Sequence, residues 1–124
     1  MISCAIIDDD EFFTRILEHY ILQVDFLKLQ QVFHDSTRAI NEIDQKNTDL
    51  IFLDMKIPQM HGLEFIEALN VKPEFVFVSG SKTYGPEAFE HNALDYLHKP
   101  VSLSRFFTDP FSAKPKTRAA RPAR

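Results

Sequence analysis

The sequence predicts a single α/β domain in which a doubly wound, five-stranded parallel sheet lies between two layers of helices. Five short apolar runs of strand length alternate along the chain with five segments of helical character. This alternation predicts parallel strands joined by crossover helices that cover both faces of the sheet. The length of 124 residues suits one domain with a single core.

The first half of the chain supplies three of the strands and two of the helices. Apolar runs at residues 2–7, 27–33 and 50–53 predict the strands. Ser36 is a suitable N-cap for the second helix. The first helix is predicted by one broad apolar face, which comprises Phe12, Phe13, Ile16, Leu17, Tyr20, Ile21 and Val24. The second helix would turn three apolar side chains inward, those of Ala39, Ile40 and Ile43.

The second half opens with a loop that Pro58 and Gly62 predict. The apolar residues 75–78, which are β-branched or aromatic, predict the fourth strand, and residues 95–97 predict a brief fifth strand. Between the loop and the fourth strand we expect a third helix, whose apolar residues are Leu63, Phe65, Ile66 and Leu69.

Two further helices complete the alternating pattern. Pro86 suits the first turn of a short fourth helix that ends near residue 91. Ser102 is a suitable N-cap for the last helix. Asp109 and Pro110 should end that helix early, because the residue before a proline avoids the helical region.

The net charge of -4 conceals an uneven distribution along the chain. Residues 112–124 carry five basic side chains and no acidic one, whereas the rest of the chain has 9 basic and 18 acidic residues. The predicted domain therefore spans residues 1–111, followed by a basic, Pro- and Ala-rich tail that we expect to be disordered. The acidic body argues against nucleic-acid binding by the domain itself.

The apolar segments also bear on the compartment. None approaches the length that a membrane helix needs, and residues 2–7 lack the basic lead of a secretory signal. The single cysteine, Cys4, lies inside the first predicted strand, so it is expected to be a buried, inert thiol. Together these features predict a cytoplasmic protein without a membrane partner.

Polar or charged residues follow four of the five predicted strands. An acidic run at residues 8–10 follows the first strand, Asp54 follows the third, Ser79 the fourth and Lys99 the fifth. In doubly wound sheets, binding and catalysis collect beyond the carboxyl ends of the strands. Clustered carboxylates repel one another unless a cation compensates, and an all-oxygen site with few protein ligands suits Mg²⁺.

Each of these residues alone has a structural explanation. A run of aspartates after a strand is often the start of a helix, where its charge meets the helix dipole favourably. Lone serines and lysines at strand ends are usually surface groups. Because all four features occur at successive strand ends of one small chain, we favour a functional site over coincidence.

Four motifs follow one another along the chain: IDDD at residues 7–10, LDMKIP at 53–58 with Gly62, VSG at 78–80 and DYLHKP at 95–100. In this order and at these spacings, they resemble the receiver domain of two-component response regulators. The resemblance covers residues 1–107 and implies a flavodoxin-like α/β/α fold with strand order 2-1-3-4-5 and five helices. It also implies a phosphorelay in which a sensor histidine kinase donates a phosphoryl group to the domain.

The resemblance implies a phosphoacceptor and a metal site. Asp54 would accept the phosphoryl group. Asp8 and Asp9 would form the acidic pair that binds Mg²⁺ together with Asp54, with Asp9 as the direct ligand of the pair. Lys56 would offer its backbone carbonyl to the same ion.

The resemblance also implies a switch. Lys99 would pair with the phosphoryl group, Ser79 would supply the switch hydroxyl, and Tyr96 would be the aromatic side chain that reports activation. The bond before Pro100 is expected to be cis. The changed surface would comprise helix 4, strand 5 and helix 5, and would mediate homodimerisation. Residues 88–97 further resemble regulators of the LytR/AlgR type, whose output is a LytTR-type DNA-binding domain.

Three other functions stay open as alternatives. A phosphohydrolase with an aspartyl nucleophile typically has a second acid two residues later, where this chain has Lys56. A nucleotide- or flavin-binding domain would need a glycine-rich phosphate loop after the first strand, where this chain has three acids. A degenerate receiver that only binds a partner would lack some of the site residues, all of which are present. We therefore expect a signalling domain and no enzyme.

Overall fold

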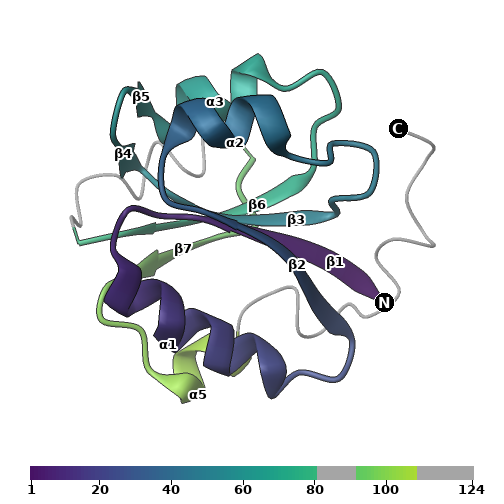
Figure 1. The fold of residues 1–124 in the computed structure, drawn as a ribbon. Coiled ribbons are helices and arrows are strands. Elements are labelled where there is room, and N and C mark those ends of the chain that lie inside the picture. The colour runs from purple at the N-terminus through teal and green to yellow at the C-terminus, as the bar shows by residue number, and fades with distance from the viewer. Residues whose placement is uncertain (81–91, 109–124) are drawn as a thin grey trace.

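The computed structural model describes residues 1–80 and 92–108 (Figure 1). The predicted fourth helix and the predicted basic tail lie outside the described residues. Within the described ranges, no helix is both long enough and apolar enough to cross a membrane.

A five-stranded parallel sheet forms the centre of the molecule. Its strand order, β2-β1-β3-β6-β7, is the predicted order 2-1-3-4-5, since β6 and β7 are the fourth and fifth strands of this sheet. The apolar residues of β1, β3 and β6 suit buried parallel strands. The strands are β1 (Ile2–Ile7), β2 (Leu27–Phe33), β3 (Leu50–Asp54), β6 (Glu74–Ser79) and β7 (Asp95–His98).

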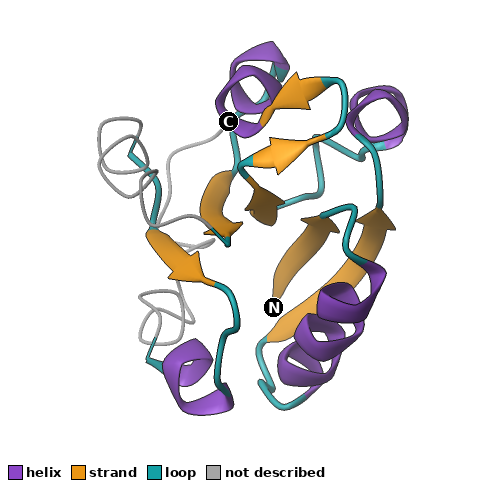
Figure 2. Ribbon diagram, turned by 90° about the vertical axis from the view of Figure 1, so that its left-hand side faces the viewer, coloured by secondary structure: helices purple, strands orange, loops and turns teal. Residues whose placement is uncertain are grey.

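Helices cover both faces of the sheet. Helices α1 (Glu11–Leu22) and α5 (Leu103–Phe107) lie on one face, and α2 (Ser36–Glu42) and α3 (Gly62–Ala68) lie on the other (Figures 1 and 2). The last helix is capped by Ser102 as predicted, and it ends at Phe107, before the Asp109-Pro110 pair.

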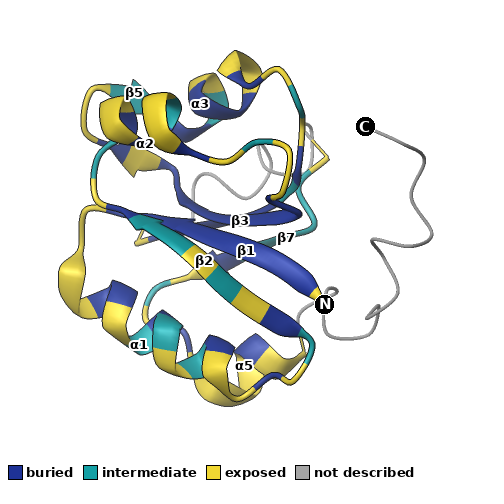
Figure 3. Ribbon diagram, turned by 45° about the vertical axis from the view of Figure 1, so that its right-hand side comes forward, coloured by how far each residue is buried: buried dark blue, intermediate teal, exposed yellow. Residues whose placement is uncertain are grey.

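The sheet divides the core into two apolar clusters because successive strand residues point to opposite faces. Ile6 of β1 packs into the cluster beneath α1 and α5, and Ile7 packs into the cluster beneath α2 and α3. Edge strand β2 is buried only at Leu27 and Phe33 and is partly or fully exposed between them, whereas β1 and β3 are buried along their length (Figure 3). The sheet is therefore a rigid support for groups at its carboxyl ends.

Two local predictions need correction. Phe12 is 75% exposed and does not belong to the apolar face of α1, which its neighbour Phe13 joins instead. Asp35, and not Ser36, caps α2 by accepting a hydrogen bond from the amide of Arg38. The Ser36 hydroxyl is buried and donates to the carbonyl of Pro58 at 2.6 Å.

The loop predicted around Pro58 contains a small antiparallel hairpin. Strands β4 (Lys56–Ile57) and β5 (Met60–His61) pair across a turn formed by Pro58 and Gln59. Gln59 has a φ of 73°, in the left-handed region that the third residue of a type II turn adopts. The hairpin fixes the chain between Asp54 and the start of α3.

Cys4 is buried in β1, as predicted. Burial raises the pKa of its thiol to about 12, and the nearby charge of Asp49 adds to this effect. The thiol therefore stays protonated and unreactive at neutral pH.

Candidate functional site

Parallel pairing brings the predicted site residues to one edge of the sheet. Ile7 is in register with Leu53, so the residues that follow them, Asp8 and Asp54, leave adjacent strands at the same level. On the other side of β3, Asp54 is in register with Val78, and Ser79 ends β6 beside β7. The carboxyl ends of four strands therefore meet at one site.

Three carboxylates gather there. Asp8, Asp9 and Asp54 each offer one oxygen, and these oxygens lie within 4.8 Å of one another. Asp8 is 1% exposed and Asp54 is 7% exposed, whereas Asp9 lies at the surface. Among the residues that the structure describes, no other group of three His, Cys, Asp or Glu side chains comes together in this way.

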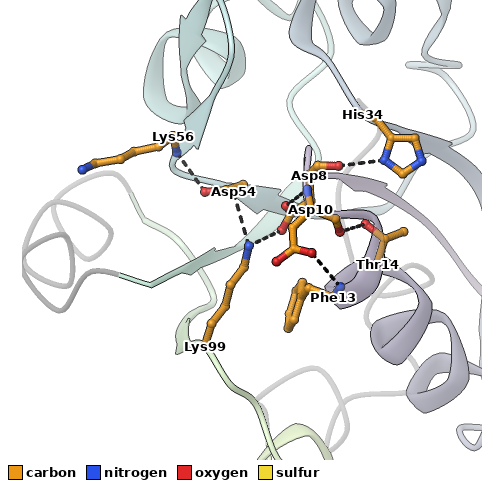
Figure 4. Close-up of polar contacts among 8 residues, drawn as sticks. All are labelled: Asp8, Asp10, Phe13, Thr14, His34, Asp54, Lys56 and Lys99. Atoms are coloured by element: carbon orange, nitrogen blue, oxygen red, sulfur yellow. Dashed lines mark hydrogen bonds and ion pairs between the residues drawn. The ribbon is translucent and has the colours of Figure 1, made fainter.

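Lys99 bridges two of these acids. Its Nζ lies 2.8 Å from Asp8 Oδ2 and 3.3 Å from Asp54 Oδ2 (Figure 4). The Lys99–Pro100 peptide bond is cis, as predicted. The ammonium thus lies where it neutralises part of the charge of the acidic cluster.

Burial and pairing oppose each other at both members of the Asp8–Lys99 ion pair. Burial raises the pKa of the Asp8 carboxyl to about 6, although the hydrogen bond from Lys99 works in the opposite direction. Burial lowers the pKa of Lys99, but its contacts with Asp8 and Asp54 outweigh burial, so the net shift is upward. Lys99 therefore stays charged at neutral pH. An additional cation near Asp8 would stabilise the ionised form of its carboxyl.

Backbone amides hold the second oxygen of each buried acid. The amide of Asp10 donates to Asp8 Oδ1 at 2.8 Å, and the amide of Lys56 donates to Asp54 Oδ1 at 2.9 Å. On the far side of Asp8, Nδ1 of His34 donates to the Asp8 carbonyl at 2.9 Å. Both carboxylates are thereby fixed in orientation before any ligand arrives.

Asp10, unlike Asp8 and Asp9, caps a helix. Its Oδ1 accepts the amide hydrogen of Phe13 at 3.0 Å and caps α1. The Thr14 hydroxyl donates to the Asp10 carbonyl at 2.9 Å. Of the acidic run that follows β1, two members therefore face the site and the third begins the helix.

Ser79 and Tyr96 lie on the two strands nearest Lys99. Ser79 is 3% exposed, and its carbonyl accepts the amide hydrogen of Lys99 at 2.8 Å, which joins the ends of β6 and β7. Tyr96 is partly buried and packs against the apolar cluster beneath α2 and α3. Both residues are thus connected to the site through the sheet.

The donor set fits a magnesium ion. It is made of carboxylate oxygens, with the buried Asp8 compensated only in part by Lys99. Hard oxygen ligands and excess negative charge suit Mg²⁺, which keeps several waters of its own. Asp8, Asp9 and Asp54 are the side chains that would hold it.

Three residues that contact the site, Phe13, Asp10 and His34, carry no individual signal of these contacts in the sequence. Phe13 carried only the helical periodicity of a core residue, and Asp10 was one of three identical neighbours. An N-cap pattern, with an acid directly before an amphipathic helix, was the available signal for Asp10. No local signal marked His34, because its contact with Asp8 depends on the pairing of β1 with β2.

The chain and its fold match a known family. The family model of the response regulator receiver domain matches residues 4–109. The chain belongs to the response regulator receiver domain family. Receiver domains are signalling domains of two-component systems, so this is the function class of the chain.

Curated relatives support the same family. An uncharacterized response regulatory protein of Vibrio cholerae is 34% identical over 107 residues, which cover 85% of this chain and 45% of that protein. The transcriptional regulatory protein BtsR of Escherichia coli is 28% identical over 107 residues, with the same coverage of 85% and 45%. The chain spans about half the length of the curated relatives it matches.

Solved structures confirm the receiver fold. The response regulatory domain of MrkE from Klebsiella pneumoniae superposes with a TM-score of 0.81 at 28% identity, covering 94% of this chain and 97% of that one. The response regulator domain of Thermotoga maritima CheB superposes with a TM-score of 0.75 at 21% identity, covering 98% and 99%. The second likeness concerns the fold alone.

Proposed function

We propose that Asp54 accepts a phosphoryl group from a phosphohistidine of a sensor histidine kinase. The observation that carries this proposal is the environment of the Asp54 carboxylate. It is buried at the carboxyl edge of the sheet, beside Asp8 and Asp9 and 3.3 Å from the Lys99 ammonium. These are the negative and positive groups that an in-line phosphoryl transfer needs around its acceptor.

The transfer moves one phosphoryl group between two nucleophiles. An oxygen of the Asp54 carboxylate attacks phosphorus, a P–O bond forms, and the P–N bond to the donor imidazole breaks with its electron pair on nitrogen. The product is an acyl phosphate on Asp54. Mg²⁺ bound by Asp8, Asp9, Asp54 and the Lys56 carbonyl would neutralise charge on the phosphoryl oxygens.

Lys99 and Ser79 then hold the product. Lys99 Nζ contacts Asp54 Oδ2 in the resting protein, so a phosphoryl oxygen on Asp54 comes within its reach. The hydroxyl of Ser79, at the end of the neighbouring strand, donates a hydrogen bond to another phosphoryl oxygen. In this proposal Lys99 pairs with the negative charge of the phosphoryl group, and the Ser79 side chain moves toward the phosphoryl oxygens.

The output surface responds to that movement. A phosphoryl group brings almost two negative charges to Asp54, Ser79 shifts toward them, and Tyr96 fills the space that Ser79 leaves. The affected surface comprises β7, the start of α5 and the predicted helix before β7, which lies outside the described residues. We propose that this surface mediates a homodimer or contacts an output domain.

The proposed setting is the cytoplasm, within a longer regulator. The curated relatives are about twice as long as the matched region, which leaves room for an output domain. A LytTR-type DNA-binding output agrees with the sequence pattern at residues 88–97. DNA contact is assigned to that output and not to the acidic receiver domain.

The alternative functions have less support. In a phosphohydrolase with an aspartyl nucleophile, a second acid would occupy the position of Lys56, whose side chain is exposed here. A degenerate receiver would not need a lysine paired with both buried acids. We therefore propose a phosphoacceptor signalling domain that assists its own phosphorylation and dephosphorylation.

A beryllofluoride titration tests this proposal. With Mg²⁺ present, beryllofluoride should shift the amide resonances of residues at the ends of β3, β6 and β7, because it mimics a phosphoryl group on Asp54. The Asp54→Ala variant should show none of these shifts. Equal shifts in the variant and in the unaltered protein would reject Asp54 as the acceptor.

A further inference from the structure

We propose that Phe13 is a positioning residue that keeps the Lys99 ammonium between Asp8 and Asp54. This inference rests on the proposed function of Lys99 and extends it to a residue of the first helix. Lys99 Nζ lies over the Phe13 ring at 4.6 Å from its centroid. An ammonium within about 6 Å of an aromatic centroid is attracted by the negative face of the ring.

The surroundings make this contact stronger than an exposed one. Phe13 is 5% exposed, and the Lys99 side chain is 17% exposed. Cation–π contacts gain strength when water is excluded from the ring and from the cation. Lys99 therefore has three partners in a partly buried space: Asp8, Asp54 and the Phe13 ring.

The backbone of Phe13 is fixed by the same acids that the ring helps to organise. The amide of Asp10 donates to Asp8 Oδ1, and the amide of Phe13 donates to Asp10 Oδ1. The Phe13 ring contacts Lys99, and Lys99 returns to Asp8 Oδ2 (Figure 4). These contacts link Asp8, Asp10, Phe13 and Lys99 in a closed ring. Displacement of one of these residues would therefore weaken the contacts of its neighbours.

The Phe13 ring also restrains the Lys99 side chain, which is otherwise flexible. Its four-carbon stem is flexible, and its ammonium is a compact point charge without the fixed fork of arginine. Two carboxylates alone leave that charge free to favour either acid. A ring face on a capped helix limits the positions open to Nζ and keeps Asp54 within its reach.

Phe13 has a packing role as well, because it belongs to the apolar cluster beneath α1 and α5. The test must separate packing from the ring–ammonium contact. Leucine at residue 13 preserves apolar volume and removes the ring, whereas tyrosine preserves the ring face. Phe106→Leu is the matched control, since Phe106 is buried in the same cluster and its ring packs at a tilt against Tyr20 and Phe52.

The first measurement needs no assumption about phosphorylation. In the metal-free protein, the ring current of Phe13 should shift the ε-methylene protons of Lys99 upfield. Phe13→Leu should abolish that shift, and Phe13→Tyr and Phe106→Leu should retain it. An unshifted Lys99 resonance in the unaltered protein would overturn the proposal.

The second measurement is a double-mutant cycle on the rate of phosphorylation by acetyl phosphate. Phe13→Leu should slow the reaction about threefold to thirtyfold, which corresponds to about 0.7–2 kcal/mol for a cation–π contact. In a Lys99→Met background the same substitution should change the rate less than about twofold, because the partner is gone. An equal slowing in both backgrounds would show a packing role alone and reject the inference.

The two measurements also separate this inference from the proposed function. If Asp54 takes no phosphoryl group while the Lys99 resonances report the ring, the proposed function fails and the ring–ammonium contact stands. If phosphorylation proceeds at Asp54 and the resonances report no ring, the proposed function stands and the role of Phe13 is rejected.

Discussion

Asp8 is the acid of the site whose charge the fold accommodates least well. Its carboxyl is 1% exposed, and burial raises its pKa to about 6, although Lys99 counteracts this in part. The pKa of Asp8 in the folded protein therefore lies above the ordinary value of 3.8, which applies to the unfolded chain. The contribution of Asp8 to stability is complete below pH 3.8, and it is lost as the pH rises through about 6.

A first prediction follows for Asp8→Asn in the presence of a chelator. The variant should match the unaltered protein near pH 4, where the carboxyl is protonated when folded. Above pH 6 it should be more stable by about 1–3 kcal/mol, since one pKa unit corresponds to about 1.4 kcal/mol. Urea unfolding across this pH range measures the difference, with exposed Asp25→Asn as the control. A pH-independent difference would contradict this account of Asp8, and added Mg²⁺ should reduce the advantage of the variant.

A second prediction concerns Gly62, which lies directly behind the acceptor. A Cβ at this position would lie 3.0 Å from the Asp54 carbonyl oxygen, 3.1 Å from the Met55 Cα and 3.2 Å from a ring carbon of Phe77. Because two of these contacts are backbone, Gly62→Ala should cost about 1–3 kcal/mol of stability. It should also slow phosphorylation.

The control for Gly62 is the glycine that follows Ser79. A Cβ at Gly80 meets nothing within 4 Å, so Gly80→Ala should leave the unfolding midpoint almost unchanged. Thermal unfolding of both variants measures the comparison. Equal stability of the two variants would mean that the chain behind Asp54 is free to move.

At the residue scale, the sequence identified the acids, the lysine and the serine because their order along the chain is the family's order. Asp8, Asp54 and Lys99 do come together in the structure, whereas the roles assigned to them remain predictions. Phe13 escaped notice because a phenylalanine at helical spacing has the same pattern whether or not a cation lies above its ring.

The N-terminus of α1 connects the site to the helical layer. Asp10 caps this helix, while its backbone amide holds the Asp8 carboxylate. A third prediction is that Asp10→Ala costs about 1 kcal/mol of stability through loss of the cap. It should also slow phosphorylation, because Phe13 and Lys99 lose their fixed support.

Asp35 provides the matched comparison for Asp10. It caps α2 in the same manner, by accepting the amide hydrogen of Arg38 at 2.8 Å. Asp35→Ala should therefore cost a similar amount of stability and leave the phosphorylation rate unchanged, and Asp10→Ser should restore both properties. Parallel effects of the two alanine variants on the rate would show that the cap of α1 has no special connection to the site.

At the element scale, every predicted strand is confirmed, and the misses are local. The sequence places two capping residues side by side at Asp35 and Ser36, and only the buried contact of Ser36 with Pro58 decides between them. Likewise, Phe12 and Phe13 both fit the broad apolar face predicted for the first helix. In the structure, Phe13 is buried against the sheet and Phe12 is exposed to solvent. The β4–β5 hairpin depends on a left-handed residue at Gln59, which is no glycine.

At the scale of the whole molecule, an ion pair connects β7 with α5 on the proposed output surface. Arg105 of α5 pairs with Asp95 of β7 at 2.7 Å. Leu103 and Phe107 of α5 are 38% and 41% exposed. A movement of β7 would therefore be passed through Asp95 and Arg105 to an apolar surface on α5.

A fourth prediction is that beryllofluoride with Mg²⁺ promotes a homodimer through this surface. Sedimentation velocity should show a concentration-dependent dimer that is absent without the phosphoryl mimic. Phe107→Ser should weaken the dimer, whereas Phe12→Ser, an exposed aromatic on α1, should not. A monomer at all concentrations would remove the dimer from the account, and equal weakening by both variants would place the interface elsewhere.

The strand order was predictable at the scale of the molecule because the family resemblance supplied it. Alternation of strands and helices alone leaves more than one right-handed winding open. Two features depend on contacts between distant strands and were not accessible from local patterns. These are the burial of Asp8 and the position of Lys99 between two acids and a ring.

The most direct test of the central claim is to trap the acyl phosphate chemically. The protein is incubated with Mg²⁺ and acetyl phosphate, then reduced with borohydride, which converts a phosphorylated aspartate to homoserine. Peptide mass spectrometry should find homoserine at residue 54 and at no other position, and omission of Mg²⁺ should abolish it. Homoserine at Asp8 or Asp9, or phosphorylation that survives in Asp54→Ala, would contradict the account.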